Sequence, residues 1–144
     1  MARRFIRNTF ITAALVALAA CSGGVVDSTP PRVQVTTDKS TYAAGSAVKA
    51  ALRNSGDGKL TYTDCWPAVQ RQTATGWSRV DTGAPVACPG ANAHELGSGS
   101  SITATVFLPG TLTPGTYRIY FSDFVGQTAA EEGRESSPFQ LTAP

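Results

Sequence analysis

Apolar residues recur at every second position along most of the chain beyond residue 32. The clearest run is Ile102, Ala104, Val106 and Leu108. Because successive side chains of a β-strand point to opposite faces of a sheet, this period predicts strands with one buried face. The same pattern predicts further strands, and these lie at 33–37, 48–52, 60–66, 117–121 and 139–141, with a shorter pair at 69 and 77–80.

Turn-forming residues separate the predicted strands. Residues 54–58 read Asn-Ser-Gly-Asp-Gly, and residues 97–100 read Gly-Ser-Gly-Ser. Such clusters end strands, and no stretch of the domain keeps the period of 3.6 residues that predicts a helix. A single sheet would leave an apolar face in water, so a second sheet must cover it. We therefore predict an all-β fold over residues 33–144, an antiparallel β-sandwich of about seven strands, with a closed barrel as the alternative.

The N-terminal segment has a different pattern. Residues 1–8 carry Arg3, Arg4 and Arg7, and residues 9–20 are almost wholly apolar. A basic start followed by about a dozen apolar residues is typical of a secretory signal peptide. We predict that residues 1–20 are an export signal. No later apolar run reaches the roughly 20 residues that cross a bilayer as a helix.

Residues 18–21, Leu-Ala-Ala-Cys, resemble the lipobox of bacterial lipoproteins. The resemblance implies cleavage before Cys21, a diacylglycerol on its sulfur and a further fatty acid, such as palmitate, on its new amino group. Several acyl chains hold a protein durably on a membrane. It also implies an extracytoplasmic location, at the outer membrane in a Gram-negative cell because Ser22 follows the cysteine. Residues 21–32 contain Gly-Gly and Pro-Pro and are expected to form a flexible tether.

Two motifs in the domain resemble those of bacterial immunoglobulin-like domains. The first is Y-x-x-G at residues 42–45, followed by V-x-A-x-L-x-N at residues 48–54. The second is L-T-P-G-T-Y at residues 112–117. The resemblance spans about residues 33–142 and implies an immunoglobulin-like sandwich. It also implies that Tyr117 forms a tyrosine corner, with its ring buried and its hydroxyl bonded to the backbone. The fold hosts many roles and does not indicate a function.

Charge argues against a nucleic-acid partner. The formal charge of the whole chain is +2. Loss of residues 1–20 removes three arginines and leaves nine basic against ten acidic residues, a net charge of −1. No basic stripe remains to neutralise a phosphate backbone. We expect the membrane, through the lipid on Cys21, and an envelope protein to be the partners.

The three cysteines divide into one lipidated residue and one pair. Exported proteins meet oxidising conditions, so Cys65 and Cys88 are expected to form a disulfide. Each lies within two residues of a proline, as expected of turns. Closing this loop stabilises by roughly 3 kcal/mol in the chain-entropy model. Their separation in sequence disfavours a redox pair, in which the cysteines lie closer together. It is also too short for the bridge between sheets of antibody domains.

Metal and catalytic chemistry find little support in the sequence, and we expect no cofactor. Beyond residue 20 there is one histidine, His94, and no methionine, so the ligands of a zinc or copper site are lacking. A calcium site would need only oxygen ligands, such as Asp57, Asp64, Asp123 or the pair Glu131 and Glu132.

A serine hydrolase would have to use His94 with Asp81, but no G-x-S-x-G motif is present. We expect His94 and Glu95 to lie in an exposed loop, and we predict no catalytic residues. Trp66 and Trp77 could stack on a sugar, but packing is the commoner role of such side chains.

The connection between the last two predicted strands is unusually long. It covers residues 125–138, whereas most hairpin loops have two to five residues. Long loops tend to be functional or disordered. The residues that would contact a partner are Gln127, Thr128, Glu131, Glu132, Arg134 and Glu135. A solvated loop with no partner is the alternative.

Three functions fit these sequence features. The first is a non-enzymatic binding or structural module on the cell envelope. The second is a small β-sandwich proteinase inhibitor, which would present an edge loop to a protease. The third, an envelope hydrolase, has the least support because no catalytic set is evident.

Overall fold

The computed structural model describes residues 32–63, 65, 67–83, 92–122, 124 and 133–144. Every regular element among them is a β-strand, so the prediction of an all-β fold is confirmed. The strands are β1 (Val33–Thr37), β2 (Thr41–Ala43), β3 (Ala47–Asn54), β4 (Leu60–Thr63), β5 (Ala68–Thr73), β6 (Gly76–Arg79), β7 (Ala93–Leu96), β8 (Ser101–Phe107), β9 (Gly115–Tyr120) and β10 (Phe139–Thr142). The predicted signal peptide, Cys21 and all of the tether except Arg32 lie outside the described residues.

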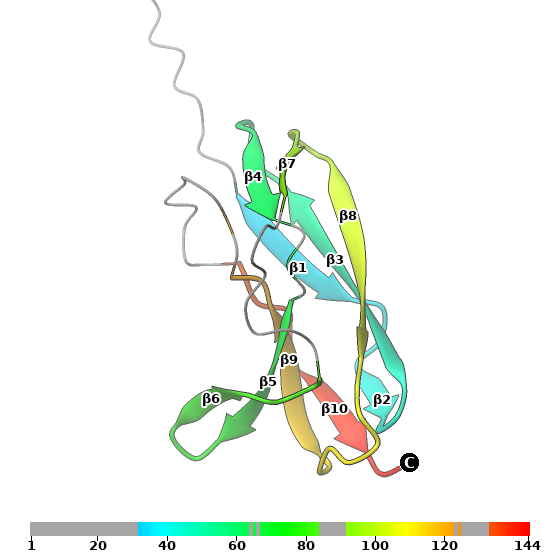
Figure 1. Cartoon of the computed structure of the whole chain (residues 1–144). Helices are drawn as coiled ribbons and strands as arrows, with labels where there is room; N and C mark the ends of the chain where they lie inside the picture. The colour runs from blue at the N-terminus through cyan, green and yellow to red at the C-terminus, as the bar shows by residue number, and fades with distance from the viewer. Residues whose placement is uncertain (1–31, 64, 66, 84–91, 123, 125–132) are drawn as a thin grey trace, which may run out of the picture.

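The strands form three sheets (Figure 1). One sheet has the antiparallel order β1-β3-β8, and a second has the order β2-β10-β9-β5-β6. The short pair β4-β7 forms the third. The sequence predicted antiparallel pairing throughout, but β2 and β10 run parallel. The alternation did not reveal β2, because a strand of three residues is too short to show a period.

The core lies between the three-stranded and five-stranded sheets. Val48, Ala50 and Leu52 of β3 are fully buried and belong to one apolar cluster with Tyr117 and Ile119 of β9. The polar residues between them point outward, as the period of two requires. The alternation in the sequence thus identified the buried faces of both sheets, and the fold is sandwich-like.

Two buried tyrosines fix the ends of this core against the backbone. Tyr117 is 1% exposed, and its hydroxyl donates to the carbonyl oxygen of Thr113 at 2.6 Å. Tyr42 packs edge-on against Phe139, and its hydroxyl donates to the carboxylate of Asp38 at 2.7 Å. Burial raises the pKa of Tyr42. The hydrogen bond from Tyr42 lowers the pKa of Asp38.

The motif at residues 42–45 has a local physical cause. Gly45 has a φ of 86°, a left-handed conformation that side chains disfavour. In this conformation its N–H donates to the carbonyl oxygen of Leu108 at 2.8 Å. The turn therefore ties the start of β3 to the end of β8, and glycine suits it best.

Candidate functional site

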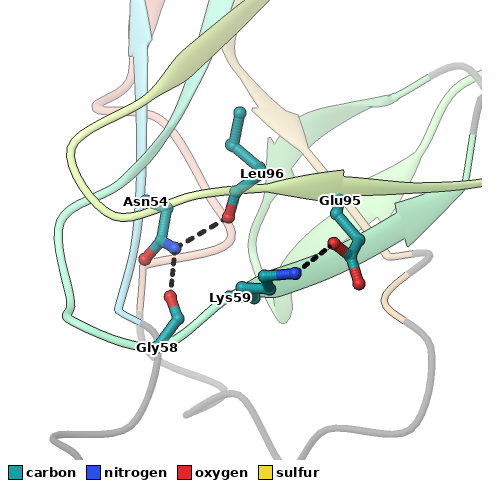
Figure 2. A network of polar contacts seen from close by, with 5 residues as sticks. All are labelled: Asn54, Gly58, Lys59, Glu95 and Leu96. Atoms are coloured by element: carbon teal, nitrogen blue, oxygen red, sulfur yellow. Dashed lines mark hydrogen bonds and ion pairs between the residues drawn. The ribbon is translucent and has the colours of Figure 1, made fainter.

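The two-stranded sheet β4-β7 forms one wall of the candidate site, and a buried asparagine holds it in place. Asn54, the last residue of β3, is fully buried. Its side-chain amide donates to the carbonyl oxygens of Gly58 at 2.6 Å and Leu96 at 3.0 Å (Figure 2). Its amide oxygen accepts from the N–H of Gly56 at 3.1 Å. One side chain thus joins the turn before β4 to the end of β7.

An exposed ion pair lies at the same end of the β4-β7 sheet. Lys59 and Glu95 lie 2.7 Å apart, from nitrogen to oxygen (Figure 2). The hydrogen bond to Glu95 raises the pKa of Lys59. Both side chains are more than half exposed, so the pair adds little to stability. The hydrogen bonds of the buried Asn54 amide therefore stabilise this end of the sheet more than the ion pair does.

An open groove of about 450 Å³ lies between the β4-β7 sheet and β8. This is within the range of ligand-binding clefts. Strands β4, β7 and β8 and the segments beside β5 and β9 supply its lining, which we call the β8 groove: Tyr62, Thr63, Cys65, Pro67, His94, residues 102–105 and Phe121. Four successive residues of β8 take part, so the groove follows the edge of this strand.

The lining of the β8 groove combines apolar surface with a few polar groups. The rings of Tyr62 and His94 lie 5.4 Å apart, on paired residues of β4 and β7. The hydroxyl oxygen of Thr63 is buried and has no hydrogen-bond partner among the described residues. Cys65 is disulfide-bonded, and its partner sulfur lies outside the described residues, so pairing with Cys88 stays a prediction.

Among the described residues, no strand pairs with the edge of β8 beside the groove. Within the described part of the chain, β8 pairs with β3 and with no other strand. Flanking bonds join the N–H of Leu108 to the oxygen of Ser46 and the N–H of Asn54 to the oxygen of Ser100. The register is unbroken between them, so the even-numbered residues of β8 bond to β3. The N–H and C=O groups of Ser101, Thr103, Thr105 and Phe107 therefore point away from β3.

A second polar surface covers the outer face of the five-stranded sheet. The guanidinium of Arg118 lies 4.4 Å from the ring centre of Trp77. Its Nε donates to Gln70 at 2.8 Å, and a terminal nitrogen lies 3.5 Å from Glu135. Arg118 thus contacts Trp77, Gln70 and Glu135. Trp77 packs against this arginine, and Trp66 lies outside the described residues.

The predicted partner loop is only partly described. Arg134 and Glu135 do not belong to a solvated loop, because the backbone of their segment pairs with the end of β9. The N–H of Phe121 donates to the oxygen of Arg134, and Glu135 forms a bridge with Tyr120. The guanidinium of Arg134 lies 5.1 Å from the ring centre of Phe124. The other four predicted residues, Gln127, Thr128, Glu131 and Glu132, lie outside the described residues.

The prediction that His94 and Glu95 lie in a loop is wrong, because both belong to β7. Strand β7 buries only its last residue, Leu96, and so shows no alternation in the sequence. Asp81, the other residue considered for catalysis, accepts from the N–H of Gly83 at 2.8 Å. No group of three or more histidine, cysteine or acidic residues that could hold a metal occurs within the described ranges. Nor do these ranges contain an apolar helix of membrane-spanning length.

Comparison with known proteins gives no functional assignment. No family model matches the chain, and no curated protein matches it. Among solved structures, it is similar to an alkylpurine DNA glycosylase from Pseudomonas fluorescens and a beta-glucosidase from Listeria innocua. Each comparison has a TM-score of 0.40 and 15% identity and covers 78% of this chain. The chain spans 31% of the first protein and 16% of the second.

Proposed function

We propose that this chain is a lipid-anchored binding module of the bacterial cell envelope, without catalytic activity. In this proposal residues 1–20 are removed on export and Cys21 carries the lipid. Residues 33–144 form an immunoglobulin-like domain, and a disulfide joins Cys65 to Cys88. The lipobox at residues 18–21 and the paired motifs at 42–54 and 112–117 support these assignments.

The observation that carries the binding role is the β8 groove beside an open strand edge. Its volume of about 450 Å³ would hold several side chains of a partner. The groove is also tied to the core, because Asn54 fixes the β4-β7 wall to the end of β3. A pre-formed cleft with a few fixed polar groups is what a binding site requires. The proteinase-inhibitor alternative needs an exposed loop aimed at a protease, and inhibition of a panel of proteases would distinguish it.

Photo-crosslinking in intact cells tests this proposal. A photoreactive residue would replace Thr105, which is exposed and lines the groove, or Gln34, an exposed residue of β1 in the same sheet. We expect a crosslinked envelope protein from position 105 and none from position 34. Crosslinks from both positions alike, or from neither, would contradict the proposed site.

Anchoring is tested separately in the same cells. The Cys21→Ser variant should leave the membrane fraction, and mass spectrometry of the parent protein should show an acylated N-terminus at residue 21. A Cys21→Ser protein that remains wholly in the membrane would contradict lipid anchoring.

A further inference from the structure

We propose that the open edge of β8 binds an extended polypeptide by strand addition, with apolar and acidic side chains alternating along the bound segment. This inference rests on the proposed function and names the ligand of the same site. The partner strand would extend the sheet β1-β3-β8 by one strand. Its apolar side chains would enter the β8 groove, and its acidic side chains would lie on the opposite, outer face.

The backbone of β8 supplies the hydrogen-bonding groups that strand addition needs. The N–H and C=O groups of Thr103 and Thr105 point away from β3, and within the described residues no strand pairs with them. Both residues are exposed, and both line the groove. Main-chain bonds of this kind provide affinity, while pockets for alternate side chains provide specificity.

The edge lacks the features that usually prevent such pairing. Exposed edges are commonly protected by lysine, proline, bulges or very short strands. Residues 101–107 read Ser-Ile-Thr-Ala-Thr-Val-Phe, with no charge and no proline. The seven-residue register with β3 contains no bulge. Phe107, on the outer face at the end of this edge, is 60% exposed, so it does not cover the edge.

The groove explains why every second side chain of the partner should be apolar. Side chains of an added strand alternate between the two faces of the sheet. Those on the inner face would lie beside Ile102 and Ala104, which are only partly buried although they face the core side. A partner side chain there would complete their burial.

Charge indicates why the other side chains should be acidic. The outer face of the sheet β1-β3-β8 carries two charged residues in its strands, Lys49 and Arg53, and both are basic and exposed. Lys49 pairs with Thr105, and Arg53 pairs with Ser101. Because the β8 residues between them and the edge are small, the long basic side chains can reach across to an added strand. Opposite charges on two strands separated by β8 still attract, and like charges repel.

Binding of synthetic heptapeptides to the full-length chain, isolated from the membranes of its host, tests the inference. One peptide alternates glutamate with valine, and the other alternates lysine with valine. We expect the glutamate peptide to bind at least tenfold more tightly than the lysine peptide, as measured by fluorescence anisotropy. Equal affinity for both peptides, or no binding of either, would overturn the inference.

Two variants separate backbone pairing from charge. Thr103→Pro removes an outward N–H, whereas its matched control, Thr103→Ala, keeps it; an edge strand tolerates proline at such a position. We expect at least a tenfold loss for Thr103→Pro and less than a twofold change for Thr103→Ala. The double variant Lys49→Glu with Arg53→Glu keeps the edge and should reverse the preference between the peptides. Parent-like binding by either Thr103→Pro or the double variant would overturn the inference.

Two further outcomes distinguish a second copy of the chain from a peptide as the occupant of the edge, and failure of this inference from failure of the proposed function. Sedimentation of the parent protein as a dimer that Thr103→Pro dissociates would assign the edge to a second copy of the chain and overturn the peptide inference. If crosslinking from position 105 succeeds while neither peptide binds, the binding module stands and only the strand-addition inference fails.

Discussion

Asn54→Asp changes one atom of a buried side chain and should loosen the β4-β7 wall of the groove. In the parent protein the side-chain amide donates to two carbonyl oxygens, those of Gly58 and Leu96. A carboxylate cannot donate, so both acceptors would lose their partner and face another oxygen. The bond from the N–H of Gly56 would remain, because it uses the other oxygen.

The cost follows from these two lost bonds. A buried acceptor left without a donor costs roughly 1–3 kcal/mol. We therefore expect Asn54→Asp to lower the free energy of unfolding by about 2–6 kcal/mol at pH 7, a large part of the roughly 5–15 kcal/mol that holds a domain together. Leu96 would be affected most directly, since its carbonyl bond is the buried one.

The free energy of unfolding that Asn54→Asp loses should also depend on pH. Burial beside two carbonyl oxygens would raise the pKa of the introduced carboxyl in the folded state above its ordinary value of about 3.9. A raised pKa of a carboxyl in the folded state means that stability is highest below the unfolded pKa and falls as pH rises. The variant should therefore be less destabilised near pH 4, where a protonated carboxyl can donate one bond, than at pH 7.

Urea unfolding at both pH values measures this prediction. The matched control is Gln72→Glu, which makes the same change from amide to carboxylate at an exposed residue and should alter stability by no more than about 0.5 kcal/mol. The reasoning is refuted if Asn54→Asp loses under 1 kcal/mol at pH 7, or if its loss does not diminish toward pH 4.

Three other predictions concern the rest of the domain. Tyr117→Phe should lower the free energy of unfolding by about 1–2 kcal/mol, because the carbonyl of Thr113 loses its donor; an unchanged denaturant midpoint would contradict this. Thiol labelling of the denatured, unreduced protein should modify neither Cys65 nor Cys88, and labelling of both would exclude the disulfide. The hydrogen bond from Tyr42 lowers the pKa of Asp38, so the charged carboxylate contributes stability above its unfolded pKa of about 3.9 that is lost as pH falls. Asp38→Asn should accordingly lose less stability between pH 5 and pH 2 than the parent, and identical acid profiles would show that this carboxylate plays no part.

The strands that the sequence predicted are those with several buried residues at alternate positions. β3 and β9 bury every second side chain, so the alternation within each strand is enough to recognise it in the sequence. β2 and β7 escaped prediction for a physical reason. β2 has three residues, and β7 buries only the last of its four. Strands this short depend on partners distant in the sequence.

The candidate site was less predictable than the fold. The alternation identified β8, and its exposed threonines were visible as the polar positions of that strand. Which edge of β8 stays open depends on the order of strands in the sheet, which a local pattern does not contain. The β8 groove likewise needs β4, β7 and β8 to converge, and no motif in the sequence marks that convergence. In the sequence, Asn54 stood out only as the last residue of the motif at residues 48–54. Its role in joining the β4-β7 sheet to β3 depends on Gly58 and Leu96, which the fold brings to its side chain.

The alternation of amide exchange along β8 tests most directly whether this edge is open for a partner. Amides bonded to β3 should exchange slowly, and amides at the open edge should exchange quickly. For the isolated full-length chain, hydrogen exchange followed by nuclear magnetic resonance should therefore show slow exchange at Ile102, Ala104 and Val106 and fast exchange at Thr103 and Thr105. Slow exchange at all five would show that the edge is already occupied in the isolated protein and would contradict the proposed site.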